Sequence, residues 1–241
     1  MSSRSVPFRV VSLPAPRAAE APAGPRLGIL GRPVVLTFAI GVVTMAIVGA
    51  TVVILRDIYG VAVGELGRLF DLDAEQNVST WFQVIQLFSA ALLGGLVALS
   101  QYRLRDSRWV YWTGIALVLT LFSADELAGF HERISQFVSW LRIGKYFVVV
   151  VGLVYLRFWW SLPARFRVLL LAACAIYFGS VMGLEVLSFH YWTPDAAHRL
   201  RYAVITVFEE TGEMIGAWLF FTTLLAYLRH TGVDLQLRLP R

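Results

Sequence analysis

Six apolar segments, each about long enough to cross a lipid bilayer, dominate this chain. They cover roughly residues 34–55, 80–100, 109–130, 145–162, 167–190 and 201–228. A helix needs about 20 apolar residues to cross the hydrocarbon core. Because a backbone in hydrocarbon must satisfy its own hydrogen bonds, segments of this length are expected to be helical. We therefore predict an all-α membrane protein, a bundle of six transmembrane helices.

Composition agrees with this class and divides the chain into three parts. Hydrophobic residues make up 58% of the sequence, against roughly 45–50% in soluble domains. Residues 1–33 are rich in Ala, Pro and Arg, which predicts a disordered tail. The membrane domain is expected over 34–228, with an outer acidic loop over 56–79, followed by a cytoplasmic tail over 229–241. The single cysteine, Cys174, excludes an internal disulfide and a cysteine-based metal site.

The basic residues predict the orientation of the bundle. Most of the 21 Lys and Arg residues lie in the N-terminal tail, in the second and fourth loops, and in the C-terminal tail. The positive-inside rule then places both termini in the cytoplasm. We expect a bacterial-type cytoplasmic (inner) membrane location and membrane lipid as a partner. No nucleic-acid motif is present, and a homo-oligomer or a larger membrane complex remains open.

Ionisable residues interrupt three of the apolar segments. They are Asp125, Glu126, His131 and Glu132 in the third, Glu185 and His190 in the fifth, and Glu209, Glu210 and Glu213 in the sixth. Such residues are costly at membrane depth and usually mark function. With both termini inside, all three groups fall near the outer leaflet. We therefore expect them to converge on one polar site.

Carboxylates with an imidazole are typical of a divalent-metal site. The predicted metal ligands are Asp125, His131, Glu132, Glu185, Glu209 and Glu213. Glu126 or Glu210 would act as general base on a metal-bound water. The interpretation is a metal-dependent hydrolase of a lipid-like substrate, with a divalent metal ion of unknown identity as cofactor. Two alternatives stay open: a proton or cation transporter, and an accessory subunit whose carboxylates form buried ion pairs.

The first outer loop is acidic. Asp71, Asp73, Glu75 and Asn77 alternate like the start of an EF-hand loop, but the required glycine and bidentate glutamate are missing. We predict a solvated acidic loop with turn and cap chemistry. A lid folded over the polar site is the alternative.

Local patterns predict one helix start and two close helix contacts. Thr80 and Gln83 match a Thr-x-x-Gln capping box. Gly179-x-x-x-Gly183 and Gly212-x-x-x-Gly216 match the small-residue spacing that lets membrane helices approach closely.

Three motifs resemble a family of uncharacterised bacterial six-helix integral membrane proteins. The matching stretches are Asp71-Leu-Asp-Ala-Glu-Gln-Asn-Val-Ser-Thr-Trp-Phe82, Ser123-Ala-Asp-Glu-Leu-Ala-Gly-Phe-His-Glu132 and Glu209-Glu-Thr-Gly-Glu-Met-Ile-Gly216. This resemblance implies a six-helix fold but no reaction. More loosely, the acidic loop resembles that of alkaline ceramidase-type membrane hydrolases, which bind zinc through histidines. Where those enzymes have a histidine pair on the last helix, this chain has glutamates.

Overall fold

The computed structural model describes residues 27–74, 76–135, 140–191 and 196–231. Within these ranges the chain forms helices joined by short connections, with no strand. The elements are α1 (Leu27–Val53), the π-helix η1 (Ile54–Ile58), α2 (Gly64–Arg68), α3 (Val78–Arg103), α4 (Trp109–Ala128), α5 (Phe130–Ser135), α6 (Trp140–Trp160), α7 (Ala164–Phe178), the π-helix η2 (Gly179–Leu184), α8 (Glu185–Tyr191) and α9 (Ala196–His230).

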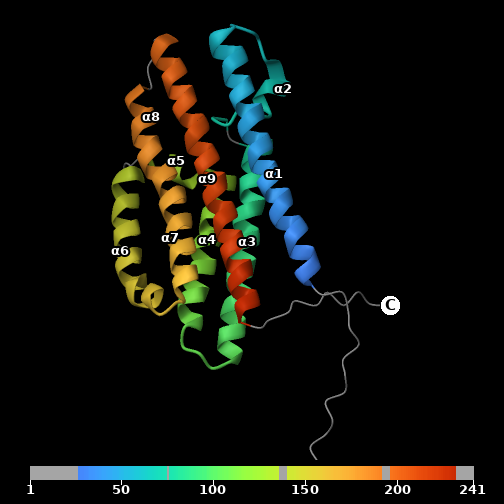
Figure 1. Ribbon diagram of the computed structural model, residues 1–241. Coiled ribbons are helices and arrows are strands. Elements are labelled where there is room, and N and C mark those ends of the chain that lie inside the picture. The colour runs from blue at the N-terminus through green and yellow to red at the C-terminus, as the bar shows by residue number, and fades with distance from the viewer. Residues whose placement is uncertain (1–26, 75, 136–139, 192–195, 232–241) are drawn as a thin grey trace, which may run out of the picture.

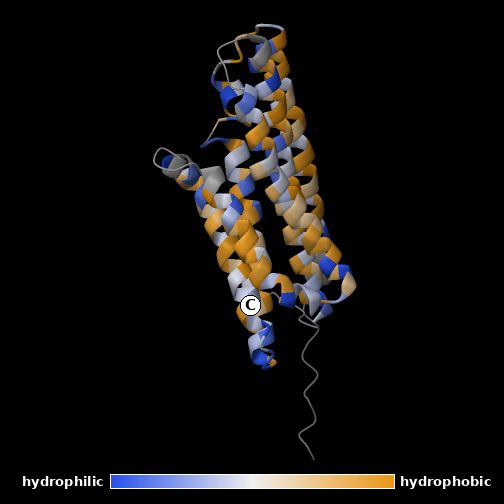
Figure 2. Ribbon diagram, turned by 90° about the vertical axis from the view of Figure 1, so that its left-hand side faces the viewer, coloured by the Kyte–Doolittle hydropathy of each residue, from blue (hydrophilic) through white to orange (hydrophobic). Residues whose placement is uncertain are grey.

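The described chain contains six helical segments that are long and apolar enough to cross a membrane. They are Gly31–Ile58, Val78–Arg103, Trp109–Ala128, Ile143–Trp160, Ala164–Ser188 and Arg199–His230. The six-helix prediction is thus confirmed as to fold, and each segment overlaps one expected from the sequence. Hydrophobic residues run along the lengths of these helices, and hydrophilic residues gather in the connections (Figure 2).

The helices form an elongated bundle with two different ends. The start of α1 and the end of α9 lie at one end, here called the termini end (Figure 1). The opposite end carries α2 and is called the α2 end. Helix α6 lies along one side of the bundle, while α9 runs through its middle (Figure 1).

Helix α9 is the central element. It packs against α1, α3, α7, η2 and α8. In its most apolar stretch 61% of the residues are buried, compared with 56% in α3 and only 11% in α6. Helices α3 and α9 therefore form the interior, and α6 presents most of its surface outward.

Small residues let α9 approach α7 and η2 closely. A Cβ atom placed on Gly216 would lie 2.8 Å from the Cα of Tyr177, and one on Gly212 would overlap the hydroxyl of Ser180. The predicted contact through Gly212 and Gly216 is confirmed. The prediction for Gly179 and Gly183 is wrong, because nothing in the described chain lies within 4 Å of a Cβ on either.

Aromatic rings interlock at the termini end. Trp112 is fully buried, and its ring lies 5.1 Å from that of Phe158 and 4.4 Å from that of Tyr227. Phe166 contacts Tyr227 edge-on at 5.0 Å. Because such ring pairs add to the packing of large buried side chains, this end holds α4, α6, α7 and α9 together.

The start of α3 corrects one prediction. The N-cap residue is Asn77, whose side-chain oxygen accepts a hydrogen bond from the backbone N–H of Thr80 at 3.0 Å. The Thr80–Gln83 capping box is therefore wrong, because the helix begins three residues earlier. Gln83 lies on the buried face of α3 instead, where its amide is available to other helices.

Candidate functional site

An acidic cavity lies inside the bundle toward the α2 end. Its volume is about 370 Å³, and α4, α6, α7, η2, α8 and α9 contribute to its walls. Seven carboxylate residues line it: Asp73, Asp125, Glu126, Glu185, Glu209, Glu210 and Glu213. His131 also lines it, whereas no Lys or Arg of the described chain does. The walls are therefore strongly acidic.

Gln83 joins three helices beside this cavity. From α3, its Nε2 donates one hydrogen bond to Glu126 on α4 at 2.9 Å and another to Glu213 on α9 at 2.8 Å. Gln83 is 2% exposed and Glu213 is 7% exposed. One amide thus holds two carboxylates close together, and its hydrogen bonds are strengthened by the low dielectric around Gln83 and Glu213.

A second buried amide lies one helical turn further along α3. Gln86 is fully buried, and neither its Nε2 nor its Oε1 has a hydrogen-bond partner among the described residues. Leaving such groups unsatisfied is costly, and native proteins usually provide a partner or a water. Gln86 is thus a second buried amide, on the same face of α3 as Gln83.

Asp125 and His131 organise the turn between α4 and α5. Gly129 ends α4 in the left-handed conformation, at φ 58°. The carboxylate of Asp125 then accepts from the backbone N–H of His131 at 2.8 Å and from its ring Nδ1 at 3.0 Å. This hydrogen bond raises the pKa of His131 to about 9, further helped by the nearby charges of Glu126 and Glu185. At neutral pH the ring is a cation that neutralises Asp125.

Glutamates reach the cavity from α8 and α9. Glu209 and Glu213 are four residues apart on α9, so they share one face of the helix, and both are buried. Glu185 opens α8 directly after η2. Because π-helical turns shift the register of the residues that follow and occur often at functional sites, we attribute the direction of Glu185 to η2.

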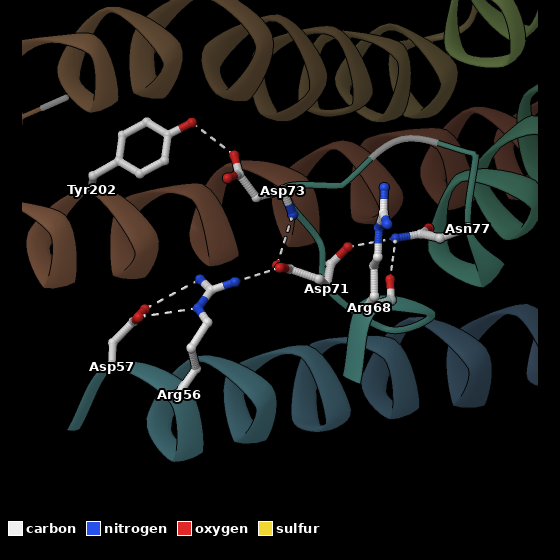
Figure 3. Close-up of polar contacts among 7 residues, drawn as sticks. All are labelled: Arg56, Asp57, Arg68, Asp71, Asp73, Asn77 and Tyr202. Atoms are coloured by element: carbon white, nitrogen blue, oxygen red, sulfur yellow. Dashed lines mark hydrogen bonds and ion pairs between the residues drawn. The ribbon is translucent and has the colours of Figure 1, made fainter. Parts of the chain in front are cut away.

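The acidic loop folds against the mouth of the cavity. Leu72, Asp73 and Ala74 belong to the lining. Tyr202 on α9 donates a hydrogen bond to Asp73 at 2.7 Å, and Arg56 in η1 pairs with Asp71 (Figure 3). The predicted turn and cap chemistry is confirmed, because Asn77 caps α3 and the Asp71 side chain accepts a hydrogen bond from the backbone N–H of Asp73. Asp73 is exposed, as expected of a solvated loop, but the loop is also fastened to η1 and to α9. Glu75, predicted as part of this pattern, lies outside the described residues.

The same network stiffens the loop from within. Arg56 also pairs with Asp57 at 3.0 Å, and the side-chain amide of Asn77 donates to the backbone oxygen of Asp71 at 2.5 Å (Figure 3). Asn77 thus caps α3 and ties the loop at once. The alternation of acidic residues serves these fixed contacts rather than an EF-hand.

The structure brings seven of the eight sequence-predicted site residues to this one cavity. The seven are Asp125, Glu126, His131, Glu185, Glu209, Glu210 and Glu213. The side chain of Glu132 lies outside the part of the chain that is described. Within that part, no three His, Cys, Asp or Glu side chains are grouped closely enough to hold one metal ion directly. The roles of these residues as ligands or general bases stay predictions.

Two residues of the site were not predicted as such from the sequence: Gln83, which bonds two of its carboxylates, and Tyr177, which lines the cavity. A signal existed for Gln83, because an amide near the start of an apolar helix and another at Gln86 share one face. No pattern pointed to Tyr177, which is 3% exposed and lines the cavity from α7.

Comparison with known families identifies the family of this chain, but that family has no assigned function. A family described as a domain of unknown function, DUF8692, matches residues 35–228. The chain belongs to the DUF8692 family. The match covers all six spanning helices nearly end to end. No curated protein and no solved structure matches the chain.

Proposed function

We propose that this DUF8692 protein is an integral membrane protein that binds a divalent cation in its acidic cavity. The observation that carries the proposal is the lining itself: seven carboxylates and no described Lys or Arg surround about 370 Å³. Carboxylates crowded in low dielectric must share protons or bind cations. His131 is the one basic side chain in the described lining, and a bound cation would supply further positive charge to balance seven carboxylates.

A partly hydrated ion suits the dimensions of the cavity. Mg²⁺ keeps several of its waters and is often held by only one or two carboxylates. A water molecule occupies roughly 30 Å³ in the liquid, so the cavity has room for an ion with its water shell. Glu209 and Glu213 are the ligands we favour, because both are buried and one turn apart on α9. Water bound to the ion would also reach the carboxylates further away.

The depth of the cavity supports a site close to a membrane interface. Glu213 lies 17 residues from the end of α9, which corresponds to about 25 Å along the helix. The hydrocarbon core is about 30 Å thick. With both termini in the cytoplasm, as the basic loops favour, the cavity opens toward the outer leaflet of a bacterial-type cytoplasmic membrane. There we propose that the cation serves hydrolysis of a lipid-like substrate, with Glu126 or Glu210 as the base.

Cation binding is tested on full-length protein purified in mild detergent without chelator. Metal content by plasma mass spectrometry and Mn²⁺ titration followed by electron paramagnetic resonance should reveal about one site per chain. The double variant Glu209→Gln, Glu213→Gln should weaken binding at least tenfold. Glu65→Gln is the matched control, because Glu65 is exposed on α2 and outside the cavity. Folded wild type that binds no divalent cation would overturn the proposal.

Buried polar groups beyond the cavity favour ion transport as a second candidate function. Gln86 and Thr223 are at most 2% exposed, and neither side chain has a described partner. They lie on α3 and α9 between the cavity and the termini end. If they support a transport path, Gln86→Leu should abolish proton or cation flux in liposomes but leave Mn²⁺ binding intact. Absence of flux in the wild type would exclude this candidate.

A further inference from the structure

The cavity has two chemically different walls. The carboxylates come from the end of α4, from α8, from α9 and from the acidic loop. Apolar side chains come mainly from α6, α7 and η2: Phe147, Val148, Phe178, Val181 and Met182, with Phe122 from α4 and Leu72 from the acidic loop. A small hydrated ion would contact only the carboxylate wall. The apolar wall is better matched by a ligand that has an apolar part.

The apolar wall belongs in part to an exposed helix. Phe147 of α6 lines the cavity, and 36% of its surface is exposed. Helix α6 is also the least buried of the spanning segments. Its described contacts with η2 are few, although both elements line the same cavity. An alkyl chain lying between α6 and η2 would be continuous with the lipid around the bundle.

We propose that the cavity takes a single-chain amphiphile with a cationic amino head group. Its alkyl chain lies between Phe147 and Val148 of α6 and Val181 of η2, and its head group meets the carboxylates. Charge complementarity selects the head group, because the lining repels anions such as phosphate or sulfonate. The aromatic rings of Phe122, Tyr177 and Phe178 also favour an ammonium group.

The depth of the site agrees with such a ligand. With the membrane placed as proposed above, the carboxylates would lie near the interface, where the head group of a membrane amphiphile resides. This inference rests on the acidic cavity of the proposed function but requires no bound metal. It specifies the substrate class of the same site.

The test uses a dodecylamine that carries a photoreactive diazirine in mid-chain. Full-length protein in phosphatidylcholine nanodiscs is irradiated with this probe, and the labelled peptides are identified by mass spectrometry. Labelling should concentrate on the α6 and η2 peptides and fall at least fivefold with excess unlabelled dodecylamine. Val148→Trp, which fills the apolar wall, should remove this labelling. Val154→Trp is the matched control, because Val154 is exposed on the same helix and does not line the cavity.

A dodecyl sulfonate with the same diazirine separates the site from the lipid-facing surface. It should label the outside of all the helices without concentration at α6 and η2. Equal labelling by both probes, or labelling that survives Val148→Trp, would overturn the proposal. The two tests are run separately and can be told apart: a protein that binds Mn²⁺ but not the amine refutes only the amphiphile, and the reverse refutes only the metal.

Discussion

The two halves of this bundle are built from opposite chemistries. Toward the termini end, Trp112, Phe158 and Tyr227 interlock with nearly no exposure. Toward the α2 end, the same helices surround a cavity of carboxylates bridged by Gln83. Helix α9 contributes to both halves, so the contrast arises along single helices. One half therefore holds the helices together, and the other keeps charged groups at a depth where they cost stability, which is typical of functional sites.

Truncating the aromatic half should have the largest effect on folding. Trp112→Ala removes a fully buried ring and should destabilise the protein by about 3–5 kcal/mol, measured by unfolding in mixed detergent–SDS micelles. Trp160→Ala is the control, because this ring is 61% exposed on the bundle surface; its effect should stay below about 1 kcal/mol. Molecules of Trp112→Ala that remain folded should still bind Mn²⁺. Loss of binding without loss of stability would contradict the division into halves.

Replacing the two buried amides of α3 by leucine should change the stability differently. Gln83→Leu leaves Glu126 and Glu213 without their shared donor and should cost about 1–3 kcal/mol. Gln86→Leu removes a buried amide that has no described partner, so it should be neutral or stabilising. Both are measured by SDS unfolding at neutral pH. Equal destabilisation by the two variants would show that Gln86 is fully bonded in the membrane.

Stability should depend on pH through the Asp125–His131 pair. The pKa of His131 is raised from 6.5 to about 9, so its contribution is complete below about pH 6.5 and disappears as the pH rises through about 9. Asp125 and Glu126 face the ring from α4, and Glu185 faces it from α8. Because the pair is partly exposed, we expect roughly 1 kcal/mol. His131→Gln should flatten this step, and an unchanged step in that variant would assign it to other groups.

The sequence predicted the helices and the acidic residues better than the contacts between them. The six spans followed from the hydrophobic segments, and the three acidic groups from the charges within them, because a bilayer imposes length and polarity on every segment. The hydrogen-bond partners of these acidic residues could not be predicted from the sequence. Gln83 meets Glu213 across 130 positions of sequence, and Asp125 bonds His131 only because Gly129 breaks the helix. Such contacts depend on how the helices are rotated and ended, which the periodicity of an apolar segment determines poorly.

The smallest effect is expected where the acidic half meets water. Tyr202→Phe removes the hydrogen bond to Asp73 and should loosen the loop by about 0.5–1.5 kcal/mol. Amide hydrogen exchange over residues 69–74 should rise by roughly two- to tenfold. Tyr59→Phe is the control, since Tyr59 is 72% exposed and no cavity residue. If exchange is unchanged in Tyr202→Phe, the pairing of Arg56 with Asp71 suffices to hold the loop. The acidic loop would then be held at the mouth of the cavity by η1 rather than by α9.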